Sequence, residues 1–280
     1  MPFRLLSSVL AALVLWASTA FGQPAPAVLQ TTSFNQQWLD TVVSIEVTDS
    51  QKELQSIGTG FLVRTANKHI VLVTAQHVIQ GPFPAGSRLA YRLNSQGGGS
   101  AIVWDDELPK GLASWFNAPA SDVACRFIAW PDSATLVTLT PDNFIADGAL
   151  SAGAPVLVLG FPLGLRSADH PRPIARHGIV GRVDHDNVIA DVFVFPGNSG
   201  GPVIYNPSLK VGQGLNSPLL NAEKLIGVVS SFLPYRETAI SLQTQRPRVV
   251  FEENSGLSNV VPVNRLVELL ASDSVKKMDA

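Results

Sequence analysis

The sequence has 280 residues, a formal net charge of −2 and 46% hydrophobic residues. A chain of this length can bury the core of one large domain or two small ones. Because the charge is close to neutral and no long basic run occurs, the chain does not resemble a nucleic-acid-binding protein, and we expect no nucleic-acid partner.

The first residues have the pattern of a secretory signal peptide. Arg4 supplies a positive charge, an apolar segment follows at 5–16, and small residues occupy 17–20. The apolar segment is short for a membrane span, so an uncleaved anchor is the less favoured alternative. We expect a signal peptide over 1–22, a flexible mature N-terminus over 23–33, and an exported protein, periplasmic or extracellular, with no stable membrane insertion after cleavage.

Short β-branched segments separated by polar turns predict strands along most of the remaining chain. A first set is expected at 42–47, 60–63, 69–74, 88–93, 101–104 and 123–128, and a second set at 155–160, 177–183, 188–195, 202–205 and 225–230. Glycine and proline punctuate nearly every gap, and long amphipathic helices between the strands are missing. The pattern predicts an all-β sandwich or barrel.

One helix is expected close to the C-terminus. Apolar residues between 261 and 270 fall largely on one side of a helix that starts near Pro262, with Asn264 as its N-cap. The last residues, 273–280, are polar and are expected to form a frayed tail.

A glycine-rich run, Pro-Gly-Asn-Ser-Gly-Gly-Pro-Val, occupies 196–203 after a predicted strand. Glycines on both sides of Ser199 permit a tight turn and a close approach of the backbone to a substrate. The backbone N–H groups of Gly197 and Ser199 can then converge on one oxygen, as an oxyanion hole requires. Ser199 is therefore the candidate nucleophile, and a plain glycine-rich turn is the alternative.

A serine nucleophile needs a base, and the base needs an orienting partner. His77 follows the apolar strand at 69–74, and Asp122 opens the strand at 123–128. Taken singly, each residue is also consistent with an ordinary turn. The combination favours catalysis, because His77, Asp122 and Ser199 each lie at the edge of a predicted strand.

Two other chemistries compete with this interpretation. The run from Gly197 to Gly201 also fits the Gly-x-Ser-x-Gly pattern of esterase-type hydrolases, in which a helix follows the serine and the histidine comes last. Here a strand is predicted at 202–205, and all five histidines precede Ser199. The only cysteine, Cys125, excludes an intramolecular disulfide, and its apolar strand predicts a buried, inert thiol.

The motifs resemble those of the trypsin-like, chymotrypsin-fold serine proteases, and most closely the HtrA-type branch without a PDZ domain. The similar segments lie at 58–63, 74–78, 122–124, 160–164, 177–180, 196–203 and 256–262, within a resemblance that covers roughly residues 35–270. The resemblance implies one protease domain over 34–272. It also implies two antiparallel β-barrels, at about 34–130 and 145–262, with the active site in the cleft between them and a short C-terminal helix.

The same resemblance implies the role of each candidate residue. His77 would be the general base and then the general acid, and Asp122 would hold its tautomer. The N–H groups of Gly197 and Ser199 would form the oxyanion hole of a serine endopeptidase that works through an acyl-enzyme. The substrate would be a protein or peptide, and neither a metal nor an organic cofactor is implied. A catalytically inactive, protease-fold binding module is the alternative.

Family alignment also places a substrate pocket. It puts Phe193 near the base of the primary pocket and Ser230, Ser231 and Phe232 along its wall. Because the base carries no acidic residue, we expect a small or apolar side chain at P1, the substrate position before the scissile bond. The alternative is that Phe193 simply packs into the barrel.

Three features depart from the family's pattern. Gln76 stands where the family usually has an alanine before the histidine, a change on a neighbouring side chain that should not forbid catalysis. Asn198 stands where the digestive enzymes have an aspartate that pairs with a newly cut N-terminal ammonium. A neutral amide cannot form that ion pair, so we expect activity that does not depend on insertion of an N-terminus. The segment 231–256 matches no motif, and we expect long loops there that shape the cleft or make a regulatory contact.

Overall fold

The computed structural model describes residues 34–49, 51–112, 114–167, 171–207 and 222–280. The chain divides into two units between Ser33 and Phe34. The predicted signal peptide and mature N-terminus at 1–33 lie outside the described residues. No helix in the described ranges is long and apolar enough to cross a membrane.

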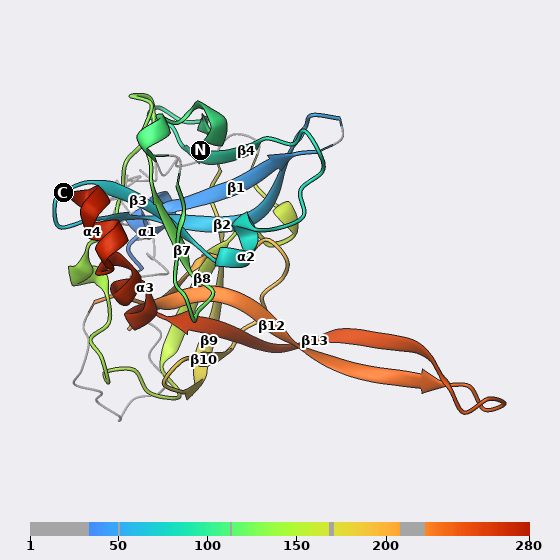
Figure 1. The fold of residues 1–280 in the computed structure, drawn as a ribbon. Helices are drawn as coiled ribbons and strands as arrows, with labels where there is room; N and C mark the ends of the chain where they lie inside the picture. The colour runs from blue at the N-terminus through green and yellow to red at the C-terminus, as the bar shows by residue number, and fades with distance from the viewer. Residues whose placement is uncertain (1–33, 50, 113, 168–170, 208–221) are drawn as a thin grey trace, which may run out of the picture. The chain divides into compact units, whose positions relative to one another are not determined.

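The first sheet has seven strands in the order β5-β4-β1-β2-β3-β7-β6 (Figure 1). Its strands are β1 (Val42–Thr48), β2 (Leu54–Arg64), β3 (Ile70–Thr74), β4 (Leu89–Asn94), β5 (Ser100–Trp104), β6 (Phe116–Asn117) and β7 (Ala124–Phe127). All neighbouring pairs are antiparallel. Six of these strands overlap the predicted ones, and the two-residue β6 is too short to leave a periodic signal in the sequence.

The second sheet closes into a six-stranded barrel in the order β10-β13-β12-β11-β8-β9. Its strands are β8 (Pro155–Gly160), β9 (Ile174–Val183), β10 (Val188–Asp191), β11 (Pro202–Tyr205), β12 (Lys224–Ile240) and β13 (Pro247–Pro262). Inward-facing aliphatic residues, most of them valines, fill the barrel. The two sheets confirm the all-β expectation and agree with a trypsin-like two-barrel fold.

Strand β10 ends earlier than the sequence predicted. The apolar run suggested a strand to Phe195, but the ladder stops at Asp191. The backbone N–H of Phe195 donates to Asn198 Oδ1 at 3.0 Å, and its carbonyl accepts the Asn198 N–H at 2.9 Å. These local bonds turn the chain into the Ser199 loop in place of continued strand pairing.

The expectation of long loops at 231–256 is wrong. That segment is the outer part of a hairpin in which β12 and β13 pair as far as Ile240 and Pro247. In Figure 1 the hairpin projects away from the barrel. Its outer side chains are exposed on both faces, so the alternation of buried and exposed residues that identifies a strand in a sequence is missing.

The C-terminal helix α3 (Val263–Leu270) forms as predicted and buries Val263, Leu266 and Leu269. Its N-cap position is Pro262, so the assignment of Asn264 as N-cap is wrong. The short helices α1 (Gln37–Asp40) and α2 (Gln76–Ile79) and the 3₁₀ turns η1 (Asp105–Glu107), η2 (Lys110–Leu112), η3 (Pro141–Asn143) and η4 (Pro162–Gly164) complete the described elements.

The predicted frayed tail at 273–280 is also wrong. Residues Asp273–Asp279 form helix α4, in which Val275 is buried against the core. Asp279 Oδ1 accepts a hydrogen bond from the Thr65 hydroxyl at 2.5 Å and lies 2.9 Å from His69 Nδ1. The polar composition concealed two apolar contacts with the core, from Val275 and Met278, and the carboxylate of Asp279, which attaches the helix to Thr65 and His69.

A buried arginine stabilises the side of the first sheet. The side chain of Arg126 is fully buried in β7. It donates hydrogen bonds to the Asp105 carboxylate, to the Tyr91 hydroxyl at 2.9 Å and to the Leu112 carbonyl at 2.8 Å. A buried charge is tolerated because every one of these groups compensates its lost hydration.

Asp105→Ala is therefore expected to lower the free energy of unfolding by about 3–5 kcal/mol, because it leaves the Arg126 charge buried without a counter-ion. Chemical denaturation followed by tryptophan fluorescence measures this change. Asp106→Ala is the matched control, since the ion-pair partner of Asp106 among the described residues is the exposed side chain of Arg88. Equal effects of the two substitutions would contradict the prediction.

Candidate active site

The structure brings His77 and Asp122 together. His77 lies on the single turn α2 directly after β3, and Asp122 precedes β7, the strand that pairs with β3. His77 Nδ1 is 2.8 Å from Asp122 Oδ2, and the His77 backbone N–H donates to Asp122 Oδ1 at 3.0 Å. The carboxylate thus binds both the ring and the backbone of His77. This fixes the ring orientation and leaves Nε2 on the side away from Asp122.

Asp122 remains ionised in this setting. Partial burial by itself raises the pKa of the carboxyl, but the hydrogen bonds from the His77 ring, the Ser230 hydroxyl and the His77 N–H outweigh it. The net pKa of Asp122 is therefore lower than its ordinary value. A charged carboxylate at this position stabilises a positive charge on the His77 ring.

Ser199 lies in the turn between β10 and β11, where the backbone needs glycine on both sides. Gly197 has φ = 99° and Gly200 has φ = 83°, conformations that favour glycine. A Cβ atom at Gly197 would lie 2.2 Å from the Phe161 carbonyl oxygen, and one at Gly200 would lie 2.1 Å from the Thr59 carbonyl oxygen. The close approach of these backbones explains the glycine-rich run.

Ser230 connects the serine to the histidine–aspartate pair. Its hydroxyl donates to Asp122 Oδ2 at 2.6 Å, and its carbonyl accepts the Ser199 hydroxyl at 3.0 Å. Among the described residues this is the one side-chain hydrogen bond of Ser199, so its hydroxyl is not bonded to the His77 ring here. Catalytic hydrogen bonds are often formed only in the substrate complex. The sequence placed Ser230 in the pocket wall and missed this connection.

The N–H groups of Gly197 and Ser199 have no hydrogen-bond partner within the described part of the chain. The carbonyls of residues 195–199, in contrast, are all bonded. The Pro196 carbonyl accepts the Leu163 N–H at 2.7 Å. Because the oxygen and hydrogen of a trans peptide point in opposite directions, this bond directs the Gly197 N–H away from Leu163. Both N–H groups are therefore available as donors to an oxyanion.

Thr59 holds the same loop from the first sheet and was missed by the sequence analysis. Its hydroxyl donates to the Gly197 carbonyl at 2.6 Å, and its backbone N–H donates to the Ser199 carbonyl at 2.8 Å. Its side chain is fully buried. The sequence does show a hydroxyl residue between two glycines at this position. It does not show that Thr59 bonds to residues about 140 positions further along the chain.

The predicted pocket residues lie in different surroundings. Phe193 is 48% exposed and does not pack into the barrel, and its ring is 3.2 Å from the position of a Cβ atom at Gly256. Phe232 packs partly against the core of the barrel. Ser231 Oγ accepts a hydrogen bond from Asn259 at 3.1 Å. Phe193 is therefore accessible to a substrate, whereas Ser230 is hydrogen-bonded to Ser199 and Asp122.

Two buried side chains near the site behave as neutral groups. Asn198 is fully buried, and its Oδ1 atom accepts the Phe195 N–H. Cys125 is buried in β7, and burial raises the pKa of its thiol to about 12.

No group of three or more histidine, cysteine, aspartate or glutamate side chains in the described ranges is arranged to hold a metal ion.

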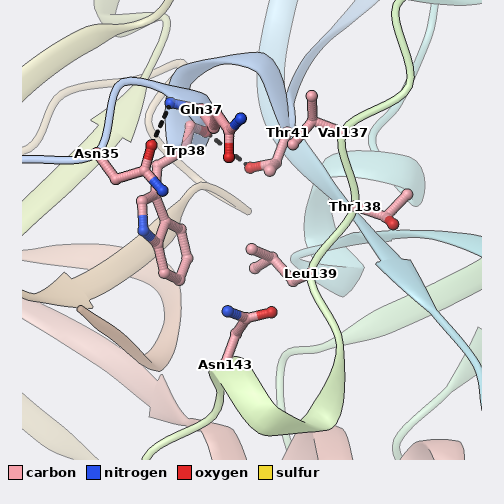
Figure 2. A pocket seen from close by; sticks show the side chains of 8 residues that line it. All are labelled: Asn35, Gln37, Trp38, Thr41, Val137, Thr138, Leu139 and Asn143. Carbon is pink, nitrogen blue, oxygen red and sulfur yellow. Dashed lines mark hydrogen bonds between the residues drawn. The ribbon is translucent and has the colours of Figure 1, made fainter. Parts of the chain in front are cut away.

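A pocket of about 80 Å³ lies elsewhere in the molecule. Figure 2 shows its lining, which comes from α1 and the residues on either side of it, from the segment before η3 and from η3 itself. The side chains are those of Asn35, Gln37, Trp38, Thr41, Val137, Thr138, Leu139 and Asn143. None of them is a predicted site residue. The chemistry-bearing residues gather instead around Ser199.

A family model described as "trypsin-like peptidase domain" matches residues 58–211. The matched span is more than half of the chain and includes His77, Asp122 and Ser199. The chain belongs to this family. A search of curated proteins finds no match. As a trypsin-like peptidase domain, the protein is expected to act on protein or peptide substrates.

Proposed function

We propose that this peptidase domain is an exported serine endopeptidase that uses His77, Asp122 and Ser199 as its catalytic residues. The observation that carries the proposal is the hydrogen-bonded series from His77 through Asp122 and Ser230 to Ser199. The signal-like pattern at 1–22 supports export to the periplasm or beyond the cell. The motif likeness supports an HtrA-type protein without a PDZ domain.

In this mechanism Ser199 Oγ attacks the carbonyl carbon of the scissile peptide bond while His77 Nε2 takes its proton. The negative charge that develops on the carbonyl oxygen is stabilised by the N–H groups of Gly197 and Ser199. The protonated His77 is stabilised by ionised Asp122 and gives its proton to the leaving amine. Water then hydrolyses the acyl-enzyme on Ser199 with His77 as base.

Labelling with a fluorophosphonate probe tests the proposal, because the probe modifies only an activated serine. We expect the full chain to be labelled and to cleave an unfolded protein, and we expect Ser199→Ala to do neither. Circular dichroism shows whether both proteins are folded. A folded wild-type protein that is neither labelled nor active would favour the inactive binding module.

The preferred P1 side chain is expected to be small or apolar. Phe193 is accessible, Gly256 lies beside it, and neither carries a negative charge that would attract lysine or arginine. Cleavage of a peptide library, read by mass spectrometry, measures this preference. Dominant cleavage after lysine or arginine would refute it.

Activity is expected to be the same for proteins with different N-termini. The buried Asn198 is neutral and already bonded to the Phe195 N–H, so it offers no carboxylate to an inserted ammonium group. Comparison of kcat/KM for variants that start at several positions between 23 and 33 measures the effect. A sharp dependence on one starting residue would contradict the prediction.

A further inference from the structure

The outer hairpin, residues 233–254, is a long two-stranded ribbon with no function in the proposed chemistry. Its strands pair from Pro234 opposite Asn254 to Ile240 opposite Pro247. An isolated two-stranded hairpin is marginally stable in water, and a third strand or a packed face normally supports it. The ribbon nevertheless exposes large apolar side chains, at half or more of their surface: Tyr235, Ile240, Leu242, Val249, Val250 and Phe251.

The outer edge of β13 has no strand partner in this hairpin. Nearer the barrel this edge pairs with β10, but that pairing ends at Leu257. From Asn254 to Pro247 the strand pairs only with β12 among the described residues. A long exposed edge with apolar side chains is a template for another strand, and proteins normally block such edges.

The sequence along this edge is complementary to itself. If two copies pair antiparallel about a two-fold axis through Val250, that residue lies opposite its own copy. Val249 then lies opposite Phe251, and Arg248 lies opposite Glu252, each pair occurring twice. Arg248 is the residue left without a β12 partner at the bulge in the β12–β13 register. Opposite charges and apolar pairs at facing positions stabilise antiparallel strands.

The pairing also joins the hairpins of the two copies into one continuous sheet. Facing residues of a hairpin share one face, so Phe251 and Glu237 lie on the same face and Val250 and Thr238 on the other. The Arg236 side chain donates a hydrogen bond to Glu252 of its own copy at 2.8 Å, which keeps the Glu252 carboxylate on the face that these two facing residues share. Four strands in the order β12-β13-β13-β12 result.

We propose that two copies of this chain associate through the outer edge of β13 to form a two-fold symmetric dimer. The charge pattern identifies the occupant: a substrate strand would be recognised through the backbone and would need no self-complementary order of arginine, valine and glutamate. The proposal is independent of the proposed chemistry at Ser199.

Analytical ultracentrifugation of the full chain tests the dimer, with Ser199→Ala present in every protein to prevent self-cleavage. We expect a concentration-dependent monomer–dimer equilibrium, and we expect Val250→Lys to be monomeric because it places two like charges on the axis. Thr238→Lys is the matched control. It adds the same charge on the same face of the hairpin but on β12, away from the second copy, and is expected to remain dimeric.

A charge exchange gives the sharper test. Arg248→Glu and Glu252→Arg each create two like-charge pairs in the homodimer and are expected to weaken association by about tenfold. An equal mixture of the two variants restores both opposite-charge pairs and is expected to form heterodimers. A monomeric wild-type protein at all concentrations, or failure of the folded variants to form heterodimers, would overturn the proposal. The same hairpin substitutions are also made in the active protein, with Ser199 intact. Loss of substrate cleavage there, without a change in oligomeric state, would identify the ribbon as a substrate-binding element and overturn the proposal as well.

Discussion

Ser199→Ala is expected to lower kcat/KM for an unfolded protein substrate by about 10⁶-fold, the effect of removing the nucleophile from a triad. The remaining activity would come from substrate binding and from the free N–H groups of Gly197 and Ser199, which the substitution leaves in place. Initial rates with a fluorogenic protein substrate measure the loss. Ser274→Ala, an exposed serine on α4, is the control and is expected to retain full activity.

A double variant with Ser199→Ala and His77→Ala tests whether the two residues act together, as they do in a triad. Because the base acts only through the serine, the double variant is expected to be no less active than Ser199→Ala alone. If the losses multiplied, the two residues would act independently and a shared mechanism would be wrong.

Asp122→Asn is expected to lower kcat by about 10⁴-fold with a much smaller change in KM. The asparagine amide can accept the His77 backbone N–H but carries no negative charge to stabilise a protonated ring, and its NH₂ group favours the wrong ring tautomer. Steady-state kinetics at neutral pH measure both constants. A large rise in KM with unchanged kcat would assign Asp122 to substrate binding instead.

The same variant reports on stability. Since the pKa of Asp122 is lowered in the folded protein, its ionisation stabilises the fold above the unfolded value of about 4 and this contribution is lost as the pH falls below it. The difference in free energy of unfolding between wild type and Asp122→Asn is therefore expected to shrink on acidification. Denaturation at a series of pH values measures it, and a difference that grows toward low pH would contradict the assignment of the pKa.

Local patterns were sufficient for the strands whose side chains alternate or are all buried. Strands β8 and β11 have the predicted bounds, and α3 lies on the predicted apolar stripe. The prediction failed where tertiary contacts compete with local preference. Phe195 leaves its strand because Asn198 binds its backbone, and α4 forms because Val275 reaches the core.

The sequence by itself determined the candidate residues, because glycines around Ser199 and strand edges at His77 and Asp122 are properties of short segments. Only the tertiary structure decided how these residues are held. Thr59 and Ser230 contact the site through hydrogen bonds to partners that are distant in the sequence, and no local pattern encodes such a distance. The same holds for the outer hairpin, because the strand partners of its β13 edge are known only from the positions of the other described strands.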